Sequence, residues 1–195
     1  ELQGHDGGVI TRHSINIVSL GLGGEVVTMV NSWRQSWPNW IGGHCRFVAA
    51  ALKALNTYQN RPVQILLVGQ TGDNSNQKPE RGNDLYLFSN FLVVANGRFA
   101  GGGMKFAPHA EIDDGLLDIV LTDKVTRWDI IKELPRIRFG AYLRNPKVKL
   151  VKSREVTIKS WPALAVDIDG ETAGFTPARL VVKPSVIRFL VGESS

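Results

Sequence analysis

The chain has 195 residues, with 43% hydrophobic and 21% charged side chains, which supplies a sizeable core and excludes a disordered chain. Its single cysteine, Cys45, excludes an intrachain disulfide framework and any zinc site built from several cysteines. The formal net charge is +5, and the apolar runs are far too short to span a bilayer. The first eight residues show no signal-peptide pattern, and we expect a chain cut from a longer one.

Positive charge is concentrated in one stretch. Residues 136–159 hold eight basic residues and one acidic residue, Glu155, so this basic stripe carries +7 and the remainder −2. It indicates an anionic partner such as phosphate, nucleic acid or an acidic membrane, or else a solvated strand face whose lysines protect a sheet edge. Nucleic acid is the weaker option, because no aromatic residue alternates with the charges between Lys147 and Lys159.

Hydrophobic patterning predicts many strands and few helices. Strands are expected over residues 9–18, 62–68, 85–95, 116–121, 148–151, 154–159, 163–169, 177–182 and 186–191. This pattern predicts an α+β fold dominated by an antiparallel sheet or sandwich.

Three helical segments are expected among these strands. Residues 25–30 look like a short helical start, and residues 41–55 have the spacing of an amphipathic helix. A capping-box pattern at 126–129 opens the third helix, and Pro135 is expected to end or kink it. One side of this helix carries Val125, Trp128, Ile131 and Leu134.

A glycine-rich segment follows the apolar run 85–95. Asn96 and Gly97 lead into Gly101, Gly102 and Gly103. Consecutive glycines allow positive φ angles and a close approach of backbone amides to a ligand, which suits a phosphate or a headgroup. They also suit a plain bulge or bend, and the segment matches neither a dinucleotide-binding motif nor a P-loop.

Acidic residues cluster around a glycine turn between residues 108 and 118. Glu111, Asp113, Asp114 and Asp118 could supply the hard oxygen ligands that Mg²⁺ or Ca²⁺ prefers. The spacing is not that of an EF-hand. From composition alone, an Asp-Gly turn that leads into a strand is the favoured interpretation.

A second acidic cluster lies at residues 166–171. Alternation along a strand places Asp167, Asp169 and Glu171 on one face. Three crowded carboxylates repel one another, so at least one pKa is expected to rise, and such a group could act as a general base. The alternative is an Asp-Gly hairpin turn on a solvated edge.

These segments occur in a recognisable order. The matching stretches are 16–23, 95–97 with 101–103, 107–110, 114–118 and 167–171. Together they resemble the C-terminal half of the diacylglycerol kinase/sphingosine kinase family, close to its soluble bacterial YegS-like lipid kinases, from about residue 9 to residue 191. The resemblance implies a β-sandwich-like domain of the lipid kinase/NAD kinase-like architecture, with a few flanking helices and an apolar lipid pocket.

The resemblance also implies a reaction, the transfer of the ATP γ-phosphoryl group to a lipid hydroxyl. In such kinases the aspartate of the terminal Asp-Gly-Glu is the general base, which falls on Asp169 here. Glu171 would orient this base or tune its pKa. Asn96, Gly97 and Gly101–Gly103 would line the cleft near the phosphates or the lipid head.

A Mg²⁺ site is implied at the Asp-Gly-Leu loop, because bacterial members of the family hold the ion there. Carried over, its ligands are the side chain of Asp114 and backbone oxygens near Glu111 and Leu116. The neighbouring carboxylate of Asp113 could compete for the ion or strengthen its binding.

One departure from the family concerns ATP. The family binds it mainly in an N-terminal domain with a Gly-Gly-Asp-Gly-Thr motif, which this sequence lacks. We therefore expect residues 1–195 to be a single acceptor-lipid domain with little or no kinase activity by itself. Its expected partner is the N-terminal ATP-binding domain of the same kinase. A non-catalytic lipid-binding or regulatory module and a NAD kinase-like enzyme domain are the alternatives, and Asp169 and Glu171 favour an enzyme.

The aromatic and basic segments suggest contact with a membrane. Trp33, Trp37 and Trp40, with the helix 41–55, could form the mouth of the lipid pocket or an interfacial anchor, although such residues are more often core. The basic stripe 136–159 could dock the domain on anionic lipid. The expected location is therefore the cytoplasm, with peripheral membrane association.

Overall fold

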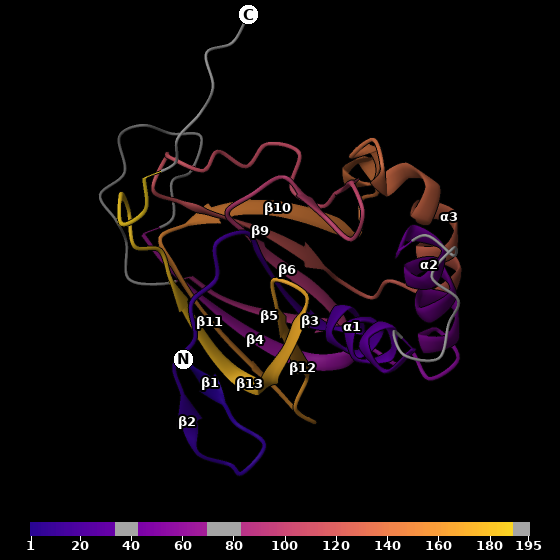
Figure 1. Cartoon of the computed structure of the whole chain (residues 1–195), viewed down its shortest axis with the longest axis horizontal. Coiled ribbons are helices and arrows are strands. Elements are labelled where there is room, and N and C mark those ends of the chain that lie inside the picture. Colours follow the sequence, from indigo (N-terminus) through magenta and orange to yellow (C-terminus); the bar gives the residue numbers. More distant parts are fainter. Residues whose placement is uncertain (34–42, 70–82, 189–195) are drawn as a thin grey trace, which may run out of the picture.

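The computed structural model describes residues 1–33, 43–69 and 83–188, and its main feature is a long antiparallel sheet (Figure 1). In spatial order its strands are β10 (Val148–Ser153), β9 (Leu117–Thr122), β6 (Phe91–Ala95), β3 (Ile17–Gly21), β12 (Ala165–Ile168), β13 (Glu171–Val181), β11 (Glu155–Ser160), β4 (Arg61–Val68) and β5 (Asn83–Ser89). The short strands off this path are β1 (Leu2–Gln3) and β2 (Val9–Ile10), beside β13, and the separate pair β7 (Phe99–Ala100) and β8 (Met104–Lys105). The predicted α+β class with mainly antiparallel strands is confirmed.

The sheet curls, so that β5 at one edge approaches the end of β9. Phe88 N donates to Asp123 Oδ1 at 3.0 Å, and Lys124 N donates to Phe88 O at 2.7 Å. Fully buried apolar side chains fill the space inside the curl, among them Leu20, Ile65, Leu92, Ile119 and Ile158. Burying each such side chain contributes about 1.5–3 kcal/mol, so this inner core stabilises the sandwich-like shape.

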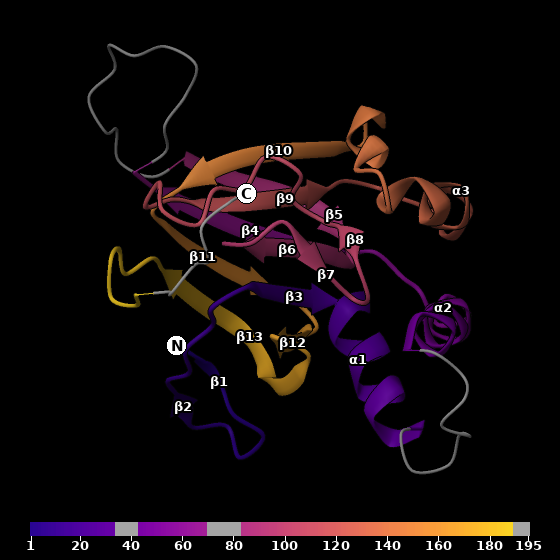
Figure 2. The ribbon, with the colours of Figure 1, turned by 45° about the horizontal axis from the view of Figure 1, so that its top comes forward.

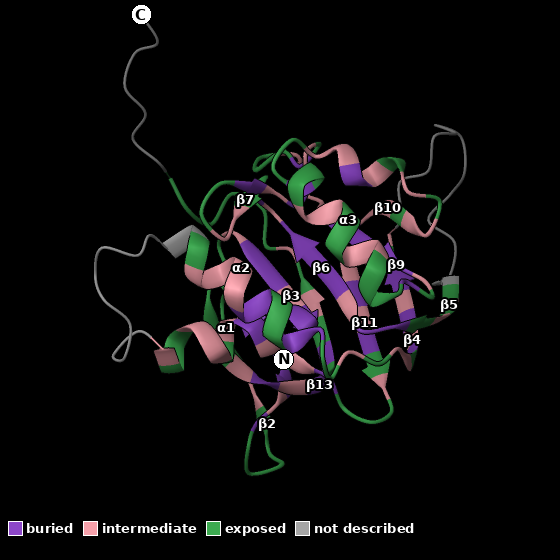
Figure 3. Cartoon of the chain, turned by 90° about the vertical axis from the view of Figure 1, so that its right-hand side faces the viewer, coloured by how far each residue is buried: buried purple, intermediate pink, exposed green. Residues whose placement is uncertain are grey.

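Helices cover the other face of β3, β6 and β9 (Figure 3). They are α1 (Leu22–Trp33), α2 (Gly43–Ala54), α3 (Arg127–Ile137) and the 3₁₀ helix η1 (Ala141–Arg144). Figure 2 shows α1, α2 and α3 gathered on the same side of the sheet. Because these strands are covered on both faces, β6 is an almost continuous apolar run. Within the described ranges no helix is long and apolar enough to cross a bilayer.

The third helix begins as predicted but differs in its later part. Thr126 Oγ1 accepts from Asp129 N at 3.2 Å and Asp129 Oδ2 accepts from Thr126 N at 2.9 Å, so the capping box is confirmed. Pro135 does not end the helix, which continues to Ile137. Trp128 is 63% exposed, and the expected apolar side therefore does not pack on the core as a unit.

The predicted strand 85–95 is divided into β5 and β6 at Asn90. Asn90 is buried, and its carbonyl accepts from Leu22 N at 2.7 Å, which ties this break to the β3–α1 junction. Gly21 has φ +75° there, and a Cβ at this position would collide with the Asn90 carbonyl. The chain therefore needs glycine where β3 turns into α1.

Other predicted elements are shorter or longer than expected. Residues 11–16 and 186–188 are not strand, while the helix expected over 25–30 extends from Leu22 to Trp33. Trp37 and Trp40 lie outside the described residues.

Candidate functional site

The β12–β13 turn carries the second acidic cluster to one end of β3. Asp169 has φ +52° and Gly170 has φ +92°, as in the two-residue hairpin turns favoured by Asp-Gly. Asp169 N donates to Ile17 O at 2.9 Å, which fixes the turn against the start of β3. Asp169 therefore belongs to an exposed turn and does not share a strand face with Asp167, contrary to the alternation argument.

The Asp169 carboxylate is held by the segment that precedes β3. Its Oδ2 accepts from Ile15 N at 2.8 Å. Its Oδ1 accepts from Ile17 N at 2.7 Å, Asn16 N at 3.1 Å and Ser14 Oγ at 3.0 Å. Four converging donors stabilise an anionic oxygen pair and fix its orientation at the surface.

The glycine-rich segment supports the same place from the end of β6. Asn96 N and Gly97 N donate to Asn16 O at 2.8 and 3.0 Å, and Asn96 Nδ2 donates to Ile15 O at 3.0 Å. Asn16 Nδ2 in turn donates to Phe99 O at 3.0 Å. A Cβ at position 97 would collide with Asn16 Oδ1, so a larger residue here would displace the Asn16 side chain from its contact with Phe99. The structure thus brings Asn96 and Gly97 together with Asp169.

Gly101, Gly102 and Gly103 form the turn between β7 and β8. Their φ angles are +57°, +81° and +96°, in the left-handed region that favours glycine. These positions agree with the bend that the sequence allowed as an alternative. That these glycines line a cleft for a phosphate or a headgroup stays a prediction.

Asp167 lies below the surface beside this turn. It is 3% exposed, and its Oδ2 accepts from Ser19 Oγ at 2.9 Å. Burial, with smaller contributions from the charges of Asp169 and Glu171, raises the pKa of Asp167 to about 6, although the hydrogen bond from Ser19 opposes the rise. The expectation that one carboxylate of this cluster has a raised pKa is confirmed, at the buried member.

The first acidic cluster forms an ion pair with the basic stripe. Asp114 Oδ1 accepts from Leu116 N at 2.9 Å, and Asp114 Oδ2 lies 2.8 Å from Lys152 Nζ. Lys152 Nζ is also 3.5 Å from Oδ2 of Asp118, which is 1% exposed. Burial raises the pKa of Asp118, and the Lys152 ammonium opposes this rise. Glu111 and Asp113 are exposed, so of the two adjacent aspartates it is Asp114 that turns inward.

An apolar cavity with about 70 Å³ of free space lies between the helices and the sheet. The apolar side chains that surround it include Leu22, Val26, Phe47, Phe91, Ile130 and Leu134. It lies toward the Leu22 end of β3, whereas Asp169 lies at the Ile17 end. Five strand residues separate these ends, which corresponds to about 15 Å.

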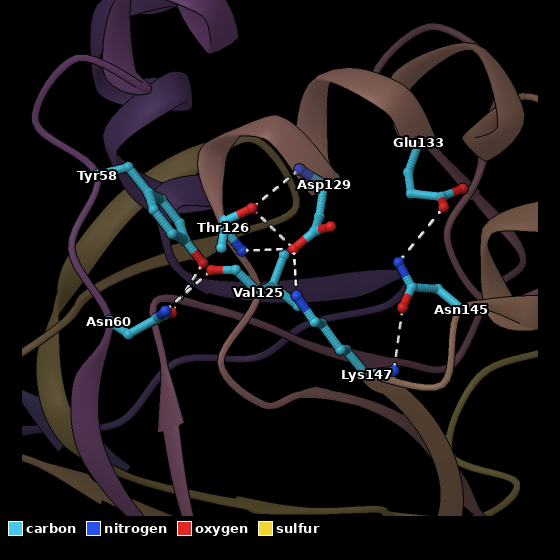
Figure 4. Close-up of polar contacts among 8 residues, drawn as sticks. All are labelled: Tyr58, Asn60, Val125, Thr126, Asp129, Glu133, Asn145 and Lys147. Carbon is cyan, nitrogen blue, oxygen red and sulfur yellow. Dashed lines mark hydrogen bonds and ion pairs between the residues drawn. The ribbon is translucent and has the colours of Figure 1, made fainter.

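Polar contacts fix α3 over this cavity (Figure 4). Lys147 Nζ lies 2.6 Å from Asp129 Oδ2. This contact, together with the hydrogen bond from the backbone N–H of Thr126, lowers the pKa of Asp129 to about 2. Asn145 Nδ2 donates to Glu133 Oε1 at 3.3 Å. On the other side, Asn60 Nδ2 donates to the carbonyl of Val125 at 2.9 Å, just before the helix.

The sequence did not single out Ser14, Ile15 and Asn16 as partners of Asp169, or Lys152 as a partner of Asp114 and Asp118. Backbone donors leave no mark on residue type, so only the polar residues Ser14 and Asn16 before an apolar strand gave a local signal. The Lys152 contact joins residues 38 apart in the chain, and only the charge pattern pointed to it.

These features define a curled β-sandwich-like domain in which a surface carboxylate turn and an apolar cavity occupy opposite ends of one strand. Residues 16–191 match the model of the YegS C-terminal NAD kinase beta sandwich-like domain, and the chain belongs to this family. The predicted relation to diacylglycerol kinases and YegS-like lipid kinases is thereby confirmed.

Individual relatives agree with this assignment. The chain is 29% identical over 157 residues to "Diacylglycerol kinase" of Mycobacterium tuberculosis, covering 80% of this chain and 46% of the relative. It is 31% identical over 189 residues to "Probable lipid kinase YegS-like" of Chromohalobacter salexigens, covering 93% of this chain and 53% of the relative. The chain thus spans about half the length of these relatives.

A solved structure shows the same fold. The crystal structure of a "putative diacylglycerol kinase" from Bacillus anthracis str. Sterne superposes with a TM-score of 0.55 at 22% identity. The match covers 88% of this chain and 51% of that chain.

Proposed function

We propose that this chain is the acceptor-binding and catalytic-base domain of an ATP-dependent lipid kinase, with Asp169 as the base. The observation that carries the proposal is the arrangement along β3. An exposed, fixed carboxylate lies at one end of this strand, and an apolar cavity lies about 15 Å away at the other. A lipid whose hydroxyl reaches Asp169 could extend its chain toward this cavity.

The reaction follows from this placement. Asp169 accepts the proton of the lipid hydroxyl while the hydroxyl oxygen forms a bond to the γ-phosphorus of ATP and the bond to ADP breaks. Glu171, the exposed first residue of β13, orients Asp169 or tunes the pKa of that base. Asn96, Gly97 and the turn Gly101–Gly103 line the cleft beside the phosphates or the lipid head.

ATP binding is assigned to a separate domain with the Gly-Gly-Asp-Gly-Thr motif. Asp169, Gly170 and Glu171 are exposed and so are accessible to such a domain. On this proposal the chain by itself has little or no kinase activity, and the whole protein is a cytoplasmic enzyme that acts at a membrane surface.

Two carboxylates at the Asp-Gly-Leu loop are the candidates for a divalent cation. Asp114 and Asp118 lie together there with the Lys152 ammonium, which pairs with both and which the cation would have to displace. We assign Mg²⁺ to the Asp114 side chain with backbone oxygens near Glu111 and Leu116. When bound, the ion would neutralise the carboxylates and fix this loop.

Thermal melting tests this assignment. At a Mg²⁺ concentration about tenfold above its Kd, binding adds roughly 1.4 kcal/mol, and the melting temperature of the chain should rise by about 3–5 °C. Asp114→Asn should abolish the rise, whereas Asp113→Asn, a matched change at the adjacent exposed carboxylate, should retain it. An equal rise in both variants would contradict Asp114 as the ligand.

The function itself is tested by phosphotransfer from labelled ATP to diacylglycerol, a sphingoid base, phosphatidylglycerol and NAD. We expect transfer to a lipid by a longer chain that includes an upstream ATP-binding domain, and little or none by residues 1–195 alone. Transfer to NAD and to no lipid would favour the NAD kinase-like alternative. Lipid binding without transfer by either chain would favour the non-catalytic module.

A further inference from the structure

The outer side of α3 carries an unusual apolar stripe. Trp128 is 63% exposed, Ile131 37% and Phe139, just past the helix, 76%. With the exposed Pro135 they follow the spacing i, i+3, i+7 and i+11, which places all four on one side at 3.6 residues per turn. The opposite side of the helix contributes Ile130, Leu134 and Ile137 to the cavity.

Basic residues lie along both borders of this stripe. Arg127 and Arg138 fall on one border and Lys132 and Arg136 on the other, and all four are exposed. The Arg127 guanidinium lies 5.9 Å from the Trp128 ring centroid. Aromatic and aliphatic side chains flanked by cations are typical of helices that lie in the interface of an anionic bilayer.

The acidic residues of α3 are turned away from this side. Asp129 contacts Lys147, and Glu133 accepts from Asn145, both on the segment that leads into β10 (Figure 4). Arg136 also lies 3.2 Å from Glu133, so its charge is partly neutralised. The outer side thus presents apolar groups and cations, while both carboxylates fix the helix to the domain.

The basic stripe expected over 136–159 is not one surface. Lys147 and Lys152 are occupied by Asp129 and Asp114. Arg154 and Lys159 flank or belong to β11, which Figures 1 and 2 show apart from α3. Of the basic residues in this stripe, Arg136 and Arg138 lie beside the exposed apolar side chains of α3 and its C-terminal end.

We propose that the outer side of α3, defined by Arg127, Trp128, Ile131, Lys132, Arg138 and Phe139, docks the domain on an anionic lipid bilayer. The inference rests on the proposed function in one respect: the same helix forms a wall of the cavity assigned to the lipid, so docking brings this cavity next to the bilayer. The partner is a lipid surface, because cations on both borders complement anionic headgroups while the stripe between them enters the acyl boundary.

Vesicle binding without ATP tests the proposal independently of phosphotransfer. The chain should bind phosphatidylcholine vesicles that contain phosphatidylglycerol, and should bind them more weakly as salt rises. Trp128→Ser with Lys132→Gln should lower the vesicle partition coefficient about 50-fold. This is the product of roughly tenfold for the lost aromatic side chain and roughly fivefold for the lost cation.

The matched control is Trp161→Ser with Lys159→Gln, because Trp161 is 82% exposed and Lys159 is exposed, yet they belong to β11 and the residue that follows it, not to α3. It should bind like the wild type. Brominated lipid should quench the fluorescence of Trp128, and Trp128→Phe should remove this component while Trp161→Phe keeps it. Wild-type vesicle binding by the folded Trp128→Ser, Lys132→Gln variant, or quenching that is undiminished in Trp128→Phe, would overturn the docking surface. Absent phosphotransfer would count only against the proposed function.

Discussion

Replacing Asp169 by asparagine in a chain that includes the ATP-binding domain is expected to lower turnover about 10²- to 10⁴-fold, the usual contribution of a general base. The amide cannot take the proton of the acceptor hydroxyl. It keeps a similar size in the turn, so the apparent KM for the lipid should change little. Initial rates with labelled ATP over a range of lipid concentrations separate the two quantities.

Asp169 also has a structural role, and the experiment must distinguish it from catalysis. An asparagine amide nitrogen would face a backbone donor such as Ile15 N, so the variant should be somewhat less stable to unfolding than the wild type. Rates should therefore be compared below the melting temperature of the variant. Asp84→Asn, at an exposed carboxylate on β5, controls for the loss of a charge and should keep wild-type turnover. Wild-type turnover by folded Asp169→Asn would refute the assignment.

The parts of the fold that depend on local patterning were predictable. The strands over 62–68 and 116–121 and the helix over 41–55 appear close to their expected positions as β4, β9 and α2. The capping box and the Asp-Gly turn were predictable for the same reason, because their hydrogen bonds and φ angles depend on adjacent residues.

The parts that depend on distant contacts were not predictable. Trp128 and Ile131 have the hydrophobicity of core residues, and only the position of the helix against the sheet shows that Ile130 lies beside Leu134 on the cavity side while they do not. Likewise, Asp169 receives its donors from residues more than 150 positions earlier in the chain. Composition and spacing therefore identified the acidic turn but not what orients it.

Asp167→Asn is expected to make the domain more stable near pH 8 and to remove a pH dependence that the wild type shows. The pKa of Asp167 is about 6 in the folded state because of burial, against an ordinary value of 3.8. The folded state thus holds the proton more tightly than the unfolded chain. This stabilising contribution is complete below the unfolded pKa and is lost as pH rises through about 6, by roughly 3 kcal/mol in total.

Urea unfolding of the two proteins near pH 4.5 and near pH 8 measures this contribution. Asparagine can still accept the hydrogen bond from Ser19 Oγ, but it carries no buried charge, so its advantage over the wild type should grow as pH rises. The difference between the two proteins is the informative quantity, since other carboxylates titrate equally in both. Asp84→Asn controls for the removal of a surface carboxylate. A difference between Asp167→Asn and the wild type that is constant over this range would mean that Asp167 is ionised without cost, and that water or a donor reaches its carboxylate in the folded domain.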